Sequence, residues 1–244
     1  MRMPSARICL WSGPRNVSTA LMYSFAQRAD TQVIDEPLYG HYLRVSGVRH
    51  PGREEVLASV DTDGERVVRE VILGPSERPV LFMKHMAHHL VALGREFLQE
   101  TVNVLLIRDP REVLASLVYQ LPNPSLADTG LAMQGELFEQ LESRGRKPPV
   151  LDSRELLLDP PKVLAALCET IGIDFDSAML SWHKGARPED GVWAPHWYEN
   201  VHRSTGFERY RSKTEPLAEH LLPLLAECRP HYERLYACAI RAGG

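Results

Sequence analysis

The chain has 244 residues, of which 44% are hydrophobic and 25% charged, a balance typical of soluble globular proteins. Its formal net charge of −4 argues against a globally basic nucleic-acid binder but leaves room for a local anion site. The sequence contains no apolar run of about 18 residues and therefore predicts no membrane span. The N-terminus lacks the apolar run of a signal peptide, so we expect a cytoplasmic protein.

Four scattered cysteines without a CxxC pair argue against a disulfide framework or a zinc site, so we expect free thiols and no bound metal. The length is sufficient for a sizeable core. We expect one domain over residues 1–244, with an irregular C-terminal lid from about residue 174.

Short apolar segments alternate with segments of helical periodicity along the chain. The pattern predicts strands at residues 7–11, 32–34, 80–83, 102–107 and 149–151. It predicts helices at residues 18–28 and 218–225. It also predicts one helix that ends at residue 97 and another that begins at residue 110. Because such strands are apolar on both faces and separated by helices, we expect an α/β fold with a central parallel sheet flanked by helices on both faces.

Residues 12–19 read Ser-Gly-Pro-Arg-Asn-Val-Ser-Thr and lie between the first strand and the first helix. The unpaired N–H groups and the dipole of a helix N-terminus bind anions, and here Arg15 adds charge while Ser18 and Thr19 add hydroxyl groups. The Gly-Lys-Ser/Thr of a Walker A motif is missing. A plain helix start with Asn16 or Ser18 as N-cap explains this segment equally well.

A second motif follows the strand at residues 102–107. Asp109, Pro110 and Glu112 have the residue types of an N-cap, a first helical position and a capping box, so the start of a helix explains them. Arg108 has no such explanation. It follows a central strand at its carboxyl end, where open α/β sheets bind ligands.

These motifs resemble the signatures of sulfotransferases that use 3′-phosphoadenosine 5′-phosphosulfate (PAPS). Residues 14–19 look like the family's Pro-Lys/Arg-Ser-Gly-Thr-Thr-like loop, which holds the 5′-phosphosulfate. Arg108 and Ser116 have the spacing of the Arg and Ser that hold the 3′-phosphate in the family. The resemblance implies a P-loop-like sulfotransferase architecture, PAPS as sulfuryl donor and adenosine 3′,5′-bisphosphate (PAP) as product, without a metal.

Two further segments extend the resemblance: residues 153–160 look like the family's Tyr-Glu-Asp-Leu-x-x-Asp-Pro signature, and Lys184-Gly185 looks like its C-terminal Lys-Gly loop. The implied donor-binding residues are Arg15, Asn16, Val17, Ser18, Thr19, Arg108, Ser116, Ser153, Lys184 and Gly185.

The sequence departs from the family pattern at three positions. Val17 replaces a glycine, Ser153 replaces an adenine-facing Tyr, and Ala20 replaces a Trp, so adenine has to contact other surfaces. The variant loop resembles a less studied sulfotransferase-like branch, some of whose members carry aminotransferase labels. The chain has no pyridoxal-phosphate lysine signature that supports such a label.

Sulfuryl transfer requires a general base for the acceptor, and two residues are candidates. Glu36 follows the second strand in the segment Asp35-Glu36-Pro37, and several bacterial and carbohydrate sulfotransferases use a Glu as base. His85 follows Lys84, but the family's Lys-x-His pattern places its base at Met86 here, and a continued strand turns His85 to the other face. Glu36 and His85 both stay open as the base, while Arg15 and Lys84 are expected to act on the transferred group.

The aromatic residues Trp182, Trp193, Trp197 and Tyr198 either close over a ligand or pack in the core. The leading hypothesis is a sulfotransferase that moves a sulfuryl group from PAPS to a hydroxyl or amine of a small-molecule acceptor. The alternatives are an ATP- and magnesium-dependent small-molecule kinase, with Asp109 as metal ligand, and an inactive nucleotide-binding protein. The oligomeric state, a homodimer included, stays open.

Overall fold

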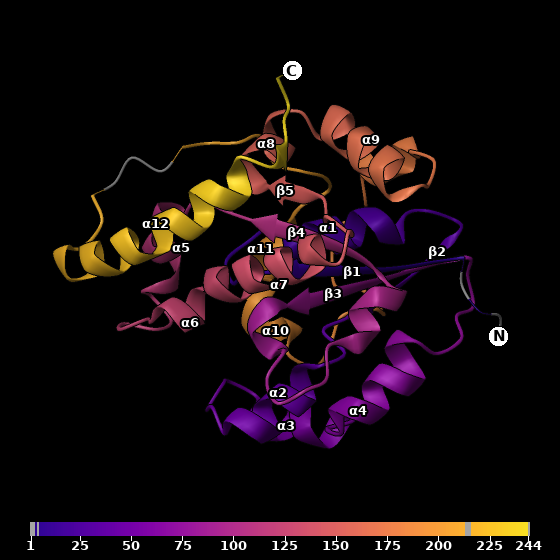
Figure 1. Cartoon of the computed structure of the whole chain (residues 1–244), viewed down its shortest axis with the longest axis horizontal. Helices are drawn as coiled ribbons and strands as arrows, with labels where there is room; N and C mark the ends of the chain where they lie inside the picture. The colour runs from indigo at the N-terminus through magenta and orange to yellow at the C-terminus, as the bar shows by residue number, and fades with distance from the viewer. Residues whose placement is uncertain (1–2, 4, 213–215, 244) are drawn as a thin grey trace. The chain divides into compact units, whose positions relative to one another are not determined.

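The computed structural model describes residues 3, 5–212 and 216–243. Its strands form one six-stranded sheet in the order β2-β3-β1-β4-β5-β6 (Figure 1). Their bounds are β1 (Ala6–Ser12), β2 (Thr31–Asp35), β3 (Val80–Met86), β4 (Val102–Ile107), β5 (Val150–Asp152) and β6 (Ala239–Ile240). The pairs β2/β3, β4/β5 and β5/β6 are parallel. The predicted α/β fold with a parallel sheet and flanking helices is therefore confirmed.

Helices connect the strands. Their bounds are α1 (Ser18–Ala26), α2 (Tyr39–Ser46), α3 (Arg53–Ser59), α4 (Gly64–Val67), α5 (Pro110–Leu117), α6 (Leu126–Thr129), α7 (Leu131–Ser143), α8 (Ser153–Leu158), α9 (Pro160–Ile171), α10 (Ala194–Trp197), α11 (Glu199–Arg203) and α12 (Leu222–Tyr236). A π-helical turn spans Val68–Ile72, and 3-10 turns span Ala87–His89, Glu96–Glu100, Ser177–Leu180 and Glu219–Leu221.

The segment between β3 and β4 differs from the prediction. The strand continues to Met86, and the helix expected up to residue 97 is replaced by the two 3-10 turns between β3 and β4. Ala92 has a φ of 44°, which interrupts any continuous α-helix there. The two-residue strand β6 was not predicted because it is too short to show a pattern.

The described chain forms two compact units. Unit 1 consists of Met1–Leu10, Ser18–Asn103 and Asp176–Phe207, and unit 2 consists of Trp11–Val17, Val104–Phe175 and Glu208–Gly244. The single domain expected over residues 1–244 stays a prediction. Within the described residues, no helix combines the length and the apolar character needed to cross a membrane.

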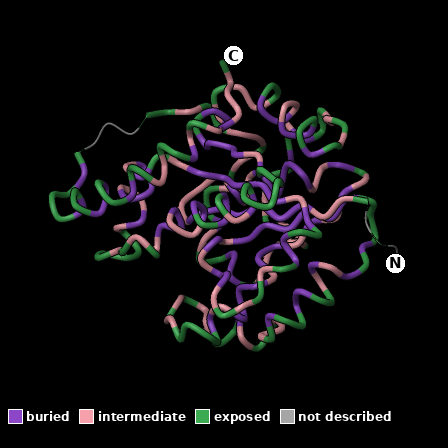
Figure 2. Tube along the Cα trace, in the orientation of Figure 1, coloured by how far each residue is buried: buried purple, intermediate pink, exposed green. Residues whose placement is uncertain are grey.

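In unit 1, β2 and β3 pair so that Asp35 lies opposite Lys84. Helix α1 packs on both strands, and α2 packs on α3. Strand β3 is buried along most of its length, as Figure 2 shows in purple. A core cluster links α2 and α3 to the segment around α10 and contains Tyr39, Leu43, Val56, Trp193, Ala194 and Tyr198.

In unit 2, β4 pairs with β5 so that Ile107 lies opposite Asp152. The two strands therefore end side by side, and the next residues along the chain are Arg108 and Ser153. Helix α12, yellow in Figure 1, packs along α5 and α7. Strand β4 is apolar apart from Asn103 and is buried from its second residue on, as the sequence pattern predicts.

Candidate functional site

The loop after β1 is built around two backbone constraints in unit 2. Arg15 has a φ of 55°, in the left-handed region that residues other than glycine rarely occupy. A Cβ atom at Gly13 would lie 2.4 Å from the carbonyl oxygen of Thr129, so only glycine fits there without a shift of the backbone. The family pattern has a glycine at the position of Val17. In this structure the residue that needs a glycine-like backbone conformation is Arg15 instead.

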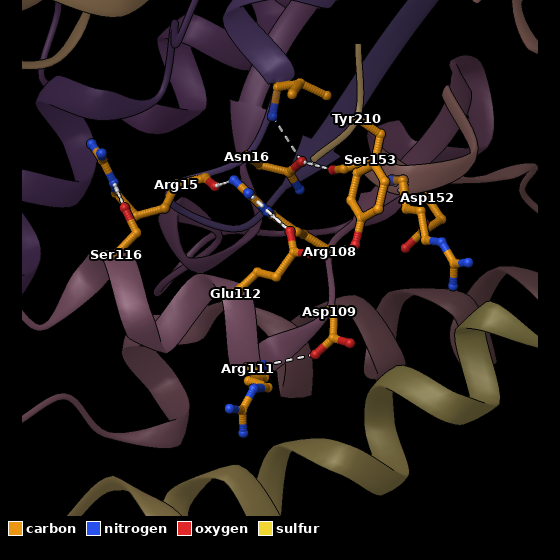
Figure 3. A network of polar contacts seen from close by, with 12 residues as sticks. Arg15, Asn16, Arg108, Asp109, Arg111, Glu112, Ser116, Asp152, Ser153 and Tyr210 are labelled. Atoms are coloured by element: carbon orange, nitrogen blue, oxygen red, sulfur yellow. Dashed lines mark hydrogen bonds and ion pairs between the residues drawn. The ribbon is translucent and has the colours of Figure 1, made fainter. Parts of the chain in front are cut away.

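The side chains of Arg15, Arg108 and Ser116 come together at this loop (Figure 3). Arg15 Nε donates to Ser116 Oγ at 2.8 Å, and Arg108 Nη1 donates to the carbonyl oxygen of Arg15 at 2.6 Å. Burial, and then the charge of Arg108, lower the pKa of the Arg15 guanidinium. Among the described residues, the two terminal nitrogens of Arg15 have no hydrogen-bond partner, so they can bind an anion.

The structure corrects the sequence interpretation of Arg108 and Glu112. Arg108 does have a structural role, because its Nε and Nη2 bind Glu112 Oε2 at 3.0 and 2.9 Å. Glu112 also accepts a hydrogen bond from Tyr210 at 2.7 Å and so faces Arg108 instead of closing a capping box. Asp109 caps α5 as predicted, by accepting from the backbone N–H of Arg111 at 2.8 Å.

Asn16 and Ser153 fix the loop to the strand ends beside it. Asn16 Nδ2 donates to the carbonyl oxygen of Leu106 at 2.9 Å, and Asn16 Oδ1 accepts from the backbone N–H of Val17 at 2.8 Å. Ser153 Oγ contacts both Asn16 Oδ1 and the carbonyl oxygen of Ile107, the latter at 3.0 Å. Both side chains therefore position the loop (Figure 3).

The remaining predicted donor-binding residues lie in unit 1. Ser18, buried, and Thr19, half-buried, begin helix α1 directly after the loop. Lys184 is exposed. Gly185 has a φ of 118°, and its N–H donates to the carbonyl oxygen of His202 at 2.8 Å. Their part in donor binding stays a prediction.

A buried charged cluster lies where β2 and β3 end in unit 1. Lys84 Nζ contacts Asp35 Oδ1 at 2.8 Å and Glu36 Oε1 at 2.6 Å, and only 1% of Lys84 is exposed. Burial alone would lower the pKa of Lys84, but the two carboxylates outweigh it and raise that pKa. Lys84 therefore stays protonated, with two carboxylates competing for its charge.

Glu36 combines backbone strain with an unusual charge environment. Its φ is 41°, and the only other non-glycine residues with positive φ in the described ranges are Arg15 and Ala92. Such strain costs about 1–3 kcal/mol and tends to persist at functional sites. Burial, the largest cause, and the charge of Asp35 raise the pKa of Glu36 although Lys84 opposes them. A raised pKa is what a glutamate needs to act as base near neutrality.

The histidines of this region are poorly suited to be the base. His85 is fully buried, and burial together with the charge of Lys84 lowers its pKa to about 3. His41 and His89 are also buried. His89 stacks on Tyr39 with ring centroids 5.0 Å apart, and burial keeps its pKa well below the ordinary value.

The aromatic residues of the C-terminal segment divide into two groups. Trp193 and Tyr198 are buried in the core cluster of unit 1, whereas Trp182 packs edge-on against Tyr23 and Phe207. These three side chains therefore pack in the core. The Tyr198 hydroxyl also reaches the charged cluster, where it accepts a hydrogen bond from Lys84 Nζ and donates one to an oxygen of Asp35.

Sequence reasoning missed the contributions of Asp35, Tyr198 and Tyr210. Asp35 directly precedes Glu36, and the pairing of β2 with β3 would have indicated its contact with Lys84. Tyr198 lies 114 residues from Lys84, and Tyr210 lies 98 residues from Glu112, so no local pattern announces either contact.

Comparison with known proteins identifies the family. The sulfotransferase domain family matches residues 6–239. Branched-chain-amino-acid aminotransferase-like protein 2 of Arabidopsis thaliana is 41% identical over 228 residues, which cover 92% of this chain and 40% of that protein. The chain thus spans about two fifths of the length of this curated relative.

Two solved structures share the fold. The sulfotransferase domain of the Synechococcus PCC 7002 olefin synthase has a TM-score of 0.56 at 18% identity, covering 93% of this chain and 95% of that chain. The sulfotransferase domain from the curacin biosynthetic pathway has a TM-score of 0.54 at 15% identity, covering 94% and 99%. With the match over residues 6–239, the chain belongs to the sulfotransferase domain family.

Proposed function

We propose that the chain is a PAPS-dependent sulfotransferase that acts on a hydroxyl or amine of a small-molecule acceptor. The observation that carries the proposal is the buried contact between Glu36 and Lys84, 2.6 Å long, in a chain of this family. It supplies a carboxylate with a raised pKa next to a permanent cation, the two groups that proton removal and sulfuryl transfer require.

In this proposal the loop after β1 binds the 5′-phosphosulfate of the donor. The terminal nitrogens of Arg15, the backbone N–H groups at the start of α1 and the hydroxyls of Ser18 and Thr19 are the donors of hydrogen bonds. Arg108 and Ser116 bind the 3′-phosphate. Glu112 already forms an ion pair with Arg108. The 3′-phosphate therefore has to share the Arg108 guanidinium with Glu112 or displace the Glu112 carboxylate from it.

The reaction we propose is one displacement at sulfur. The acceptor oxygen or nitrogen bonds to sulfur, and the bond from sulfur to the bridging phosphate oxygen breaks, so PAP leaves. Glu36 takes the proton of the acceptor, and Lys84 stabilises the negative charge of the sulfuryl group. Arg15 stabilises the charge that develops on the departing phosphate.

Two other activities fit these residues less well. An ATP-dependent kinase would use Asp109 as a metal ligand, but Asp109 caps α5. An aminotransferase needs a lysine that loses its proton to form a Schiff base, whereas the carboxylates of Asp35 and Glu36 raise the pKa of Lys84, the buried lysine.

The proposal is tested with radiolabelled PAPS and a panel of phenols, alcohols and amines. We expect label transfer to at least one class, and Glu36→Gln should lower kcat by roughly 10²- to 10⁴-fold. PAP affinity should stay unchanged, because Glu36 does not contact the donor's phosphates in the proposed mechanism.

Glu55→Gln is the matched control, since it removes an exposed carboxylate from α3. It should transfer sulfate at the parent rate. Parent-like transfer by Glu36→Gln would remove Glu36 as the base, and label transfer to no acceptor despite tight PAP binding would favour the inactive nucleotide-binding alternative.

A further inference from the structure

We infer that Asp35 and Tyr198 are positioning residues that assign the exchangeable proton of the buried cluster to Glu36. The inference extends the proposed function, on which it rests only for the role of Glu36 as base. Asp35, Glu36 and Lys84 together hold two carboxyl groups and one ammonium group in a buried site. The hydrogen bonds around the two carboxyl groups determine which of them takes up the exchangeable proton.

The direction of the Tyr198 hydroxyl follows from its neighbours. Trp193 Nε1 lies 3.1 Å from the Tyr198 oxygen, and Lys84 Nζ is also within hydrogen-bond distance of it. An indole N–H and an ammonium group can only donate. The Tyr198 oxygen therefore accepts from both, and its single proton is directed to Asp35 Oδ2 at 2.7 Å.

Asp35 thus accepts more hydrogen bonds than Glu36. Its Oδ1 accepts from Lys84, and its Oδ2 accepts from Tyr198 and from the backbone N–H of Gly191 at 3.3 Å. An ionised carboxylate accepts hydrogen bonds, whereas a protonated one must place its own proton, and the three donors that contact Asp35 in the described part of the chain leave no acceptor for such a proton. The proton that the cluster exchanges is left to Glu36, whose side chain receives a short hydrogen bond from Lys84 at 2.6 Å.

Several other titratable groups pack on or beside the cluster. Burial raises the pKa values of Tyr39 and Tyr198 and lowers those of His85 and His89. Lys84 stays protonated. His202 packs edge-on against Tyr198, with ring centroids 6.2 Å apart, so the titration has to be followed at the carboxyl carbons themselves.

The decisive variant is Tyr198→Phe, which keeps the ring in the core and removes the hydroxyl. Asp35 then loses a donor and competes for the proton, so we expect the titration midpoint of Glu36 to fall by about one pH unit. ¹³C NMR of the ligand-free protein with labelled Asp and Glu carboxyl groups measures it. In the transfer assay, the acid limb of the kcat profile should move to lower pH, and plateau kcat should fall roughly three- to tenfold with the KM for PAPS unchanged.

Tyr39→Phe is the control, because it removes another hydroxyl of the same core cluster, one that contacts His50 at 2.9 Å instead of Asp35. It should leave the Glu36 midpoint in place. Asp35→Asn is a second variant, and it should lower the Glu36 midpoint because Glu36 becomes the sole carboxylate partner of Lys84.

An unchanged Glu36 midpoint in Tyr198→Phe would overturn the inference, whatever Asp35→Asn shows. The NMR titration needs neither donor nor acceptor, so it separates this outcome from failure of the proposed function. If the protein transfers no sulfate but the midpoint shifts as expected, the proton assignment holds and the sulfotransferase proposal fails.

Discussion

At the scale of single residues, backbone strain coincides with the chemistry. Two residues held at positive φ, Arg15 and Glu36, were both predicted from the sequence as site residues. They could be predicted because Arg15 lies in the loop after β1 and Glu36 directly follows β2, at strand ends where ligands of α/β sheets gather. The contacts of Lys84 with Asp35 and Tyr198 could not be assigned, because they depend on strand neighbours and on packing far along the chain.

The role of Arg108 can be tested by a single substitution. Its guanidinium holds the carbonyl oxygen of Arg15, and in the proposed function it also binds the 3′-phosphate. Arg108→Ala should weaken PAP binding roughly 10- to 150-fold, the value of about one charge-assisted hydrogen bond, and weaken 5′-AMP much less. Isothermal titration calorimetry measures both affinities. Arg111→Ala, in the first turn of α5, is the control for the loss of one positive charge.

Equal losses of affinity for PAP and 5′-AMP in Arg108→Ala would show that the residue acts only through the loop. A loss of affinity for PAP that is much larger than the loss for 5′-AMP would show that Arg108 binds the 3′-phosphate, in addition to its structural contact with Arg15.

At the scale of elements, the strands with continuous apolar runs were the most predictable. Strand β4 has the bounds expected from the sequence, and Asp109 and Pro110 begin α5 as expected. The region between β3 and β4 was predicted wrongly, because a left-handed residue and short 3-10 turns leave no periodic signal. The order of the strands determines which site residues meet, and it is not readable from local patterns.

We expect Asp152, at the start of α8, to make the free energy of unfolding depend on pH. Asp152 is fully buried and accepts from the backbone N–H groups of Arg154 and Glu155, and burial raises its pKa from 3.8 to about 6. Since the folded state holds this proton more tightly, the free energy of unfolding falls as pH rises from about 4 to about 6, by roughly 3 kcal/mol. Asp152→Asn keeps the N-cap acceptor and should flatten that dependence.

Urea unfolding at several pH values between 4 and 7 measures the effect. Asp159→Asn, at the N-cap of α9, is the matched control and should leave the slope in place. A slope that persists in Asp152→Asn would assign the pH dependence to another group.

At the scale of the whole molecule, the chain is a sulfotransferase-family protein with an overall charge of −4, in which Arg15 and Arg108 nevertheless meet at the loop after β1. The fold class followed from the alternation of strands and helices, and the family followed from two short motifs. The division into two compact units was not predicted, because no change in composition marks it. The acceptor depends on surfaces that neither motif encodes.

The measurement that tests the central claim most directly is the thermal stability of the protein with PAP, with 5′-AMP and with ATP plus magnesium. At about 100 times its Kd, PAP should stabilise the fold by about 2.7 kcal/mol and raise Tm by roughly 5–10 °C. At equal concentrations, 5′-AMP should give a smaller shift, and ATP with magnesium should not exceed it. A magnesium-dependent shift with ATP and none with PAP would contradict the account.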